Sequence, residues 1–156
     1  NRKTDLTANK HPQHLTQALR SLHREGVLSL FCATTMPDHI HLPFILGETC
    51  DLSTSISKFK NHTRKRIAKD SLYWQRNYYD HRLRHAPNTN EFARYIFLNP
   101  YRKNLLHPSD TWPHWVCSRD YQPDFLSQLD PTGTPPATWH QNAPAAQELI
   151  EADTTP

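Results

Sequence analysis

The chain has 156 residues, enough for one domain or for one domain with a tail, and its formal net charge is +3. Four Trp, six Tyr and six Phe supply apolar surface for a core, and no apolar run reaches the ~20 residues of a membrane span. Three widely spaced cysteines argue against a disulfide framework or a zinc ribbon and indicate a reducing cytoplasm.

Charge is distributed unevenly along the chain. Residues 1–106 hold 17 Lys and Arg against 8 Asp and Glu, whereas residues 107–156 hold one Arg against seven acids and eight of the 13 prolines. The sequence therefore predicts a basic domain over 1–106 that binds a polyanion, nucleic acid first, and a Pro-rich acidic tail over 107–156 that is partly disordered.

The first half of the chain predicts a helix followed by a hairpin. Leucines at helical spacing predict a helix over 14–25, ended by Gly26. Two apolar segments, 27–35 and 39–46, predict antiparallel strands joined by a turn at 36–38. Pro43 removes one donor from the second strand, so that strand needs a sheet edge or a bulge at this point.

Three further elements follow the hairpin. Asp51 or Ser53 is expected to cap a helix that runs to about Asp70. Residues 78–84 are a strand candidate, and a last helix begins at 88 or 89. That helix is expected to end at Asn99, because a proline disfavours helical geometry in the residue before it.

This order predicts an α+β fold, a ferredoxin-like or RRM-like antiparallel sheet with helices on one face. A β-α-β-β-α-β unit needs a strand before residue 12, and residues 1–11 do not supply one, so the first strand is expected to be missing from this chain.

His39 and His41 stand at positions i and i+2 of the second predicted strand, where two side chains point to the same side. Two converging neutral imidazoles are a usable pair of metal ligands. For a bare His-x-His pattern, two polar residues on a solvated strand face are the commoner case. The apolar opposite face of the strand, formed by residues 40, 42, 44 and 46, favours a dedicated site here.

Tyr95 and Asn99 are one helical turn apart and share a helix face. A tyrosine is a nucleophile when a metal or a base assists it, and an amide oxygen can be a metal ligand. Without the histidines, Tyr95 would be read as a core aromatic and Asn99 as a helix end.

The segment 58–85 carries nine Lys and Arg against two acids, interleaved with aromatic residues. Cations neutralise phosphates and aromatic rings stack on unpaired bases, so this segment predicts contact with single-stranded nucleic acid. A solvated helix face is the alternative. Four other histidines are expected to be ordinary surface residues: His11, His14, His23 and His107.

Three motifs together resemble a known family. Residues 36–42 (MPDHIHL) resemble the His-hydrophobic-His signature of single-tyrosine transposases, and residues 74–84 (WQRNYYDHRLR) with 95–100 (YIFLNP) resemble the REP-associated tyrosine transposases. That family is similar to the insertion-sequence-200 transposases, which move DNA as single strands. The resemblance covers residues 12–106.

The resemblance implies roles for individual residues. His39, His41 and Asn99 would bind Mg²⁺ or Mn²⁺, and Tyr95 would be the nucleophile that forms a 5′-phosphotyrosine, with Tyr78 and Tyr79 as rival tyrosines. The partner would be single-stranded or hairpin DNA in the bacterial cytoplasm, at the nucleoid, and the protein a monomer or a homodimer. The DNA-binding residues would be Lys58, Lys60, Arg64, Lys65, Arg66, Trp74, Arg76, His81, Arg82 and Arg84.

Three alternatives remain open at the level of the sequence. A non-catalytic single-stranded nucleic-acid-binding module would share the fold class and the charge, although the RRM aromatic signature is absent. An inactive truncated transposase copy would bind DNA without cleaving it. A metal-dependent phosphoesterase would need a second cluster of ligands, which the sequence does not show.

Overall fold

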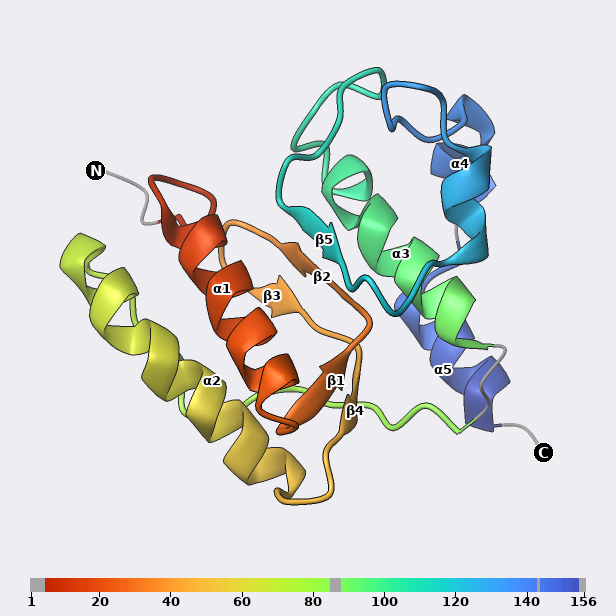
Figure 1. Ribbon diagram of the computed structural model, residues 1–156. Helices are drawn as coiled ribbons and strands as arrows, with labels where there is room; N and C mark the ends of the chain where they lie inside the picture. Colours follow the sequence, from red (N-terminus) through yellow and green to blue (C-terminus); the bar gives the residue numbers. More distant parts are fainter. Residues whose placement is uncertain (1–4, 85–87, 143, 155–156) are drawn as a thin grey trace. The chain divides into compact units, whose positions relative to one another are not determined.

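The computed structural model describes residues 5–84, 88–142 and 144–154, and it confirms the α+β class (Figure 1). The chain forms two compact units. The first runs to Tyr78 and includes His114–Asp120, and the second holds Tyr79–Pro113 and the chain from Tyr121 onward. Within the described ranges, every helix is too short or too polar to span a lipid bilayer.

The predicted hairpin forms in the first unit, but both of its strands are interrupted. The first strand divides into β1 (Leu28–Leu30) and β2 (Cys32–Thr35), and the second into β3 (Ile40–His41) and β4 (Phe44–Leu46). β1 pairs antiparallel with β4, and β2 pairs antiparallel with β3. The expectation of two continuous strands is therefore wrong, while that of antiparallel pairing is confirmed.

Pro43 lies at the interruption. Leu30 is opposite Phe44 and Thr34 is opposite His41, so three residues of the first strand face two of the second, which is a β-bulge. Pro43 has no N–H to donate, and its carbonyl accepts from the Phe31 N–H at 3.1 Å. The sequence predicts a sheet edge or a bulge at Pro43, and the structure has the bulge.

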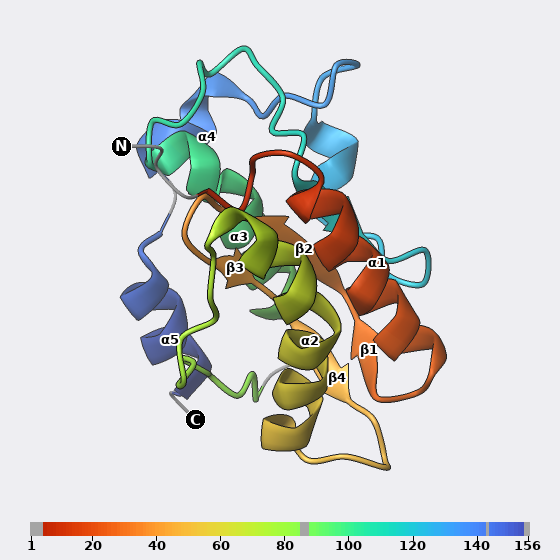
Figure 2. The same cartoon turned by 90° about the vertical axis from the view of Figure 1, so that its left-hand side faces the viewer.

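Two long helices cover one face of these strands. α1 (His11–Arg24) and α2 (Leu52–Ile67) lie side by side in both views, in front of the strands in Figure 2. The Asp51 side chain accepts from the Thr54 N–H at 2.7 Å, so the predicted helix cap is confirmed, and η1 (Ala68–Asp70) continues α2. The buried core between these elements includes Leu15, Leu19, Leu22, Leu28, Leu30, Phe59 and Ile67.

The third strand of the larger sheet comes from a distant part of the sequence. β5 (Trp115–Cys117) pairs antiparallel with β2 and gives the order β3-β2-β5. This strand belongs to residues 107–156, which the sequence sets apart as a tail. No pattern in a three-residue strand marks its partner, so the sequence does not reveal this pairing.

The strand expected over residues 78–84 is absent, and that prediction is wrong. In this region backbone groups form hydrogen bonds with side chains rather than with a neighbouring strand. The Lys60 ammonium donates to the carbonyls of residues 75–77 at 2.9, 3.2 and 3.5 Å. Further on, the Arg84 N–H donates to the Asp153 carboxylate at 2.9 Å.

The second unit is built around α3 (Asn88–Arg102), which continues past Pro100. The expected end at Asn99 is therefore wrong. Pro100 removes one intrahelical donor, but the Lys103 N–H still donates to the Asn99 carbonyl at 3.0 Å and the Leu105 N–H to the Pro100 carbonyl at 3.0 Å. Those bonds, with the burial of Tyr101, stabilise the last turn.

Three short elements pack on α3 within the second unit: η2 (Asp124–Gln128), α4 (Ala137–Asn142) and α5 (Ala146–Thr154). Phe125 is central to this packing, because its ring centroid is 5.2 Å from that of Phe97 and 6.0 Å from that of Trp139. Residues 107–156 thus contribute one strand to the first unit and these three helical segments to the second.

The pairing of β5 with β2 gives a testable prediction. Cys32 is directly opposite Cys117, and the flanking bonds, Ser118 N–H to the Phe31 carbonyl and Thr35 N–H to the His114 carbonyl, make theirs a non-hydrogen-bonded pair. The Cα atoms of such a pair are about 4.5 Å apart, close enough for a disulfide. Burial raises the pKa of both thiols, that of Cys117 to about 11.

We therefore expect diamide to link Cys32 to Cys117 within one chain, and to do so faster at alkaline than at neutral pH, because the thiolate is the reactive form. Peptide mass mapping after oxidation measures the product, and Cys50, which lies before α2, is the internal control. A disulfide that involves Cys50 in place of this pair would contradict the register of β5.

Candidate functional site

The two histidines of the predicted metal site converge in the first unit. β3 begins directly after the turn at 36–38, which is closed by a hydrogen bond from the Met36 N–H to the His39 carbonyl at 2.8 Å. The Nε2 atoms of His39 and His41 lie 3.0 Å apart, and the rings meet edge to face with centroids 4.7 Å apart. The i, i+2 spacing therefore brings the two imidazole rings together on one side of the strand, as the sequence predicts.

Asp38 fixes the orientation of His39. Its Oδ1 atom is 2.6 Å from the Nδ1 atom of His39, so Nδ1 is the nitrogen that carries the proton and Nε2 keeps its lone pair. A carboxylate behind a histidine in this way is typical of metal-binding imidazoles. Sequence reasoning missed this role of Asp38, although its position beside His39 is the signal that would have found it.

His41 is held in its neutral form. Burial is the main cause that lowers its pKa, to about 4; His39 lowers it further, and Asp38 opposes the change. Because Nε2 of His39 keeps its lone pair, the 3.0 Å contact between the two Nε2 atoms is a hydrogen bond that neutral His41 donates, and a cation bound at this point would replace that proton. The pair fits two positions in the coordination of a divalent cation.

The other two predicted site residues lie on α3, in the second unit. Asn99 is buried, with 4% of its surface exposed, and Tyr95 is half-buried one turn before it. The Arg102 guanidinium carbon is 4.9 Å from the centroid of the Tyr95 ring, and its Nη1 donates to the Pro144 carbonyl at 2.6 Å. This places a cation beside the predicted nucleophile.

A joint site of all four residues stays a prediction. His39 and His41 belong to the first unit, and Tyr95 and Asn99 belong to the second. Within the part of the chain that the structure describes, no group of three or more His, Cys, Asp or Glu side chains is arranged to hold a metal.

The predicted DNA-binding cations differ in their surroundings. Arg64, Lys65 and Arg66 are exposed on α2, whereas Lys58 is half-buried. Lys60 is held by the carbonyls of residues 75–77, and its ammonium lies 5.6 Å from the centroid of the Tyr78 ring. Lys60 therefore anchors the segment that follows α2.

The aromatic residues of this region divide into two kinds. The Trp74 indole donates to the Thr63 hydroxyl at 2.8 Å and its ring centroid is 5.7 Å from that of Phe59, so Trp74 packs on the core. Tyr73 and Tyr79 are 78% and 84% exposed. Exposed rings of this kind are suited to stacking on unpaired bases.

The remaining predicted DNA-binding residues lie between Trp74 and the described end of this segment. Arg76, Arg82 and Arg84 have exposed side chains. His81 stacks on Phe92, with ring centroids 5.7 Å apart, and its Nε2 atom is 3.2 Å from the carboxylate of Asp153 on α5. Sequence reasoning missed Asp153, because the acidic character of the tail does not show which acid meets which base.

Asp153 gives a second testable prediction. Its carboxylate is fully buried and accepts from the Arg84 N–H in a part-buried hydrogen bond, so Asp153→Ala removes a charge-assisted bond together with the contact to His81. We expect a loss of about 2 kcal/mol in the free energy of unfolding, measured by urea denaturation, together with faster amide exchange at Arg84. Glu151→Ala, which removes an exposed acid from the same helix, should leave both values close to wild type; equal effects of the two substitutions would contradict this role.

Comparisons with known proteins support the resemblance read from the motifs. The family model described as "Transposase IS200 like" matches residues 1–97. A Haemophilus influenzae protein named "Putative REP-associated tyrosine transposase" is 25% identical over 107 residues, which cover 60% of this chain and 61% of the relative. The chain thus spans about three fifths of that relative's length. No solved structure matches the chain.

Proposed function

Since the chain belongs to the IS200-like transposase family, we propose that it cleaves and rejoins single DNA strands through a covalent bond to Tyr95. The observation that carries this proposal is the convergence of the His39 and His41 Nε2 atoms, 3.0 Å apart, in a chain of this family. The Haemophilus influenzae relative is named as a transposase of the tyrosine class, which agrees with a tyrosine nucleophile.

In the proposed reaction the Tyr95 hydroxyl oxygen attacks the phosphorus of a phosphodiester. A P–O bond to Tyr95 forms and the P–O3′ bond breaks. The phenol proton is released, and the departing O3′ takes up a proton. The products are a 5′-phosphotyrosine and a free 3′-hydroxyl, which can attack the phosphotyrosine in reverse and join DNA without ATP.

His39, His41 and Asn99 would hold a divalent cation, Mg²⁺ or Mn²⁺. When bound, such a cation supplies Lewis-acid polarisation of the scissile phosphate. Imidazole ligands favour Mn²⁺, whereas Mg²⁺ is the more abundant cellular ion. Asp38 keeps the Nε2 lone pair of His39 available, and burial keeps His41 neutral.

The chain's own cations would hold the DNA strand. Exposed arginines and lysines on α2 and in the segment after it neutralise phosphates, while the exposed rings of Tyr73 and Tyr79 stack on bases. Arg102 adds a positive charge at the face of Tyr95. We propose single-stranded or hairpin DNA as the substrate, met in the bacterial cytoplasm at the nucleoid by a monomer or a homodimer.

A denaturing gel tests the proposal. The protein is incubated with labelled single-stranded hairpin DNA taken from the flanks of its own gene, with Mn²⁺ or Mg²⁺. We expect a slowly migrating protein–DNA adduct that EDTA abolishes. Binding in a native gel without any adduct would overturn the catalytic proposal and favour an inactive copy or a non-catalytic binding module.

A further inference from the structure

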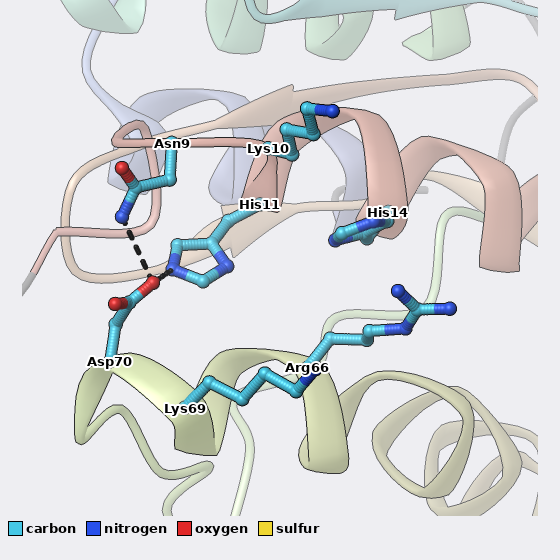
Figure 3. A pocket seen from close by; sticks show the side chains of 7 residues that line it. All are labelled: Asn9, Lys10, His11, His14, Arg66, Lys69 and Asp70. Carbon is cyan, nitrogen blue, oxygen red and sulfur yellow. Dashed lines mark hydrogen bonds and ion pairs between the residues drawn. The ribbon is translucent and has the colours of Figure 1, made fainter.

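A hollow of about 150 Å³ lies where α1 begins and α2 ends, entirely within the first unit (Figure 3). It is separate from the histidines of β3. Three cationic residues and two imidazoles line it, against a single carboxylate, and Figure 3 shows the Lys10 side chain turned away from the imidazoles. The lining residues are Asn9, Lys10, His11, His14, Arg66, Lys69 and Asp70.

His11 is at the buried side of this hollow, and the expectation that it is a surface residue is wrong. Its side chain is 4% exposed, and its Nε2 atom is 2.8 Å from the Asp70 carboxylate, which also accepts from the Asn9 amide at 2.9 Å. Both ring nitrogens are buried and, within the described part of the chain, neither has a partner in regular hydrogen-bond geometry, so the Asp70 contact is an ion-pair distance only and Nδ1 is the nitrogen away from Asp70. Figure 3 shows this nitrogen on the side that faces His14.

His14 is the second imidazole and lies three residues further along α1. Its Nδ1 atom is also shielded from solvent and has no partner among the described residues. Burial lowers its pKa, and the charges of Arg66, His11, Lys10 and Lys69 lower it further. Two buried ring nitrogens that lack partners are costly unless a ligand satisfies them.

The start of α1 adds positive potential to the same place. The helix has 14 residues, no side chain caps its first turn, and that turn contains no acidic residue. The positive end of the helix dipole is therefore not compensated by a neighbouring carboxylate of the helix. Asp70 is already engaged by His11 and Asn9.

We propose that this hollow binds a phosphate group of the DNA strand. The inference rests on the proposed function for the identity of the strand, but the cluster itself specifies an anion. The lining cations repel a metal ion, an imidazolium ring can donate from Nδ1 to a tetrahedral oxyanion while Nε2 stays beside a carboxylate, and long flexible cations suit the same ligand. Exposed Lys65 lies four residues before Lys69, so the two share a helix face, and a strand held here would follow α2.

The consequence for the protein is a second anchor on the strand, away from the reacting phosphate. Burial and the neighbouring cations lower the pKa of His14, and a bound phosphate favours its protonated form, so binding takes up a proton and strengthens as the pH falls. The other charged groups that line the hollow are Lys10, Arg66, Lys69 and Asp70.

The test compares two matched double variants of the full chain. Arg66→Gln with Lys69→Gln removes two cations that line the hollow, and Arg20→Gln with Arg24→Gln removes two cations from the other end of α1. Imidazole ¹⁵N resonances of His11 and His14 are followed during titration with inorganic phosphate and with single-stranded DNA that carries or lacks a 5′-phosphate. DNA affinity is measured in parallel by fluorescence anisotropy across salt concentrations.

We expect both imidazoles to shift with DNA in the wild type and in the Arg20/Arg24 variant. In the Arg66/Lys69 variant the shifts should be lost, the affinity should fall about tenfold, and the salt slope should be shallower by about 0.7, one phosphate contact. If the imidazole shifts require the 5′-phosphate, the ligand is a terminal phosphate. If DNA with and without the 5′-phosphate gives the same shifts, the ligand is a phosphate of the DNA backbone.

The two proposals fail in different ways. DNA that binds without shifting either imidazole, or shifts that both double variants lose equally, would overturn the phosphate site and leave the transposase function intact. If inorganic phosphate shifts both imidazoles but DNA does not bind, the phosphate site stands and the proposed function fails.

Discussion

Tyr95→Phe is expected to abolish the covalent protein–DNA adduct, lowering strand cleavage by on the order of 10⁴-fold or more, because the substitution removes the only atom that attacks the phosphorus. Phenylalanine keeps the ring, so the contact with the Arg102 guanidinium, 4.9 Å from the ring centroid, is retained. Binding of single-stranded DNA, measured by fluorescence anisotropy, should stay within about twofold of wild type.

Tyr78 and Tyr79 are the matched controls for this substitution. Each carries a phenol in the basic segment, and Tyr79 is 84% exposed. Tyr78→Phe and Tyr79→Phe should leave the yield of adduct on a denaturing gel unchanged. An adduct that survives Tyr95→Phe and disappears in one of these variants would assign the nucleophile to that tyrosine and remove Tyr95 from the mechanism.

The sequence predicts well those structural features that depend on residues close together along the chain. The hairpin, the cap at Asp51 and the bulge at Pro43 each depend on residues that are close in sequence and on one physical rule: alternation, a carboxylate before a helix, or a missing donor. The convergence of His39 and His41 follows in the same way from the two-residue period of a strand.

Long-range pairing is what the sequence does not predict. β5 joins β2 across more than eighty residues, and the buried Asp153 meets His81 from α5; neither segment carries a pattern that specifies its partner. Tertiary packing also overrides a local rule at Pro100, where burial of the surrounding α3 residues outweighs one lost hydrogen bond. Packing within the first unit likewise buries His11, which the sequence predicts to be a surface residue.

The candidate site has both properties. Each half of it is local: two histidines two residues apart on a strand, and Tyr95 with Asn99 one turn apart on a helix. A joint site would require residues of both units to meet, so the proposal is tested by a reaction that needs the residues of both units. The metal requirement of the adduct is such a test, because two proposed ligands, His39 and His41, come from one unit, whereas Asn99 and the proposed nucleophile come from the other.

Asp38→Asn is expected to weaken Mn²⁺ binding by about 10- to 100-fold, because the carboxylate 2.6 Å from the His39 Nδ1 atom both fixes the tautomer and makes Nε2 a stronger donor. Isothermal titration measures the affinity, and the metal concentration that gives half of the maximal adduct should rise by the same factor. Because Tyr95 is untouched, saturating Mn²⁺ should restore the adduct, which separates Asp38→Asn from a loss of the nucleophile.

Asp80→Asn, at an exposed acid of the other unit, is the control and should bind Mn²⁺ as the wild type does. An unchanged affinity in Asp38→Asn, with affinity lost in His39→Ala, would show that His39 binds the metal without help from Asp38; affinity unchanged in both variants would place the metal away from the histidine pair.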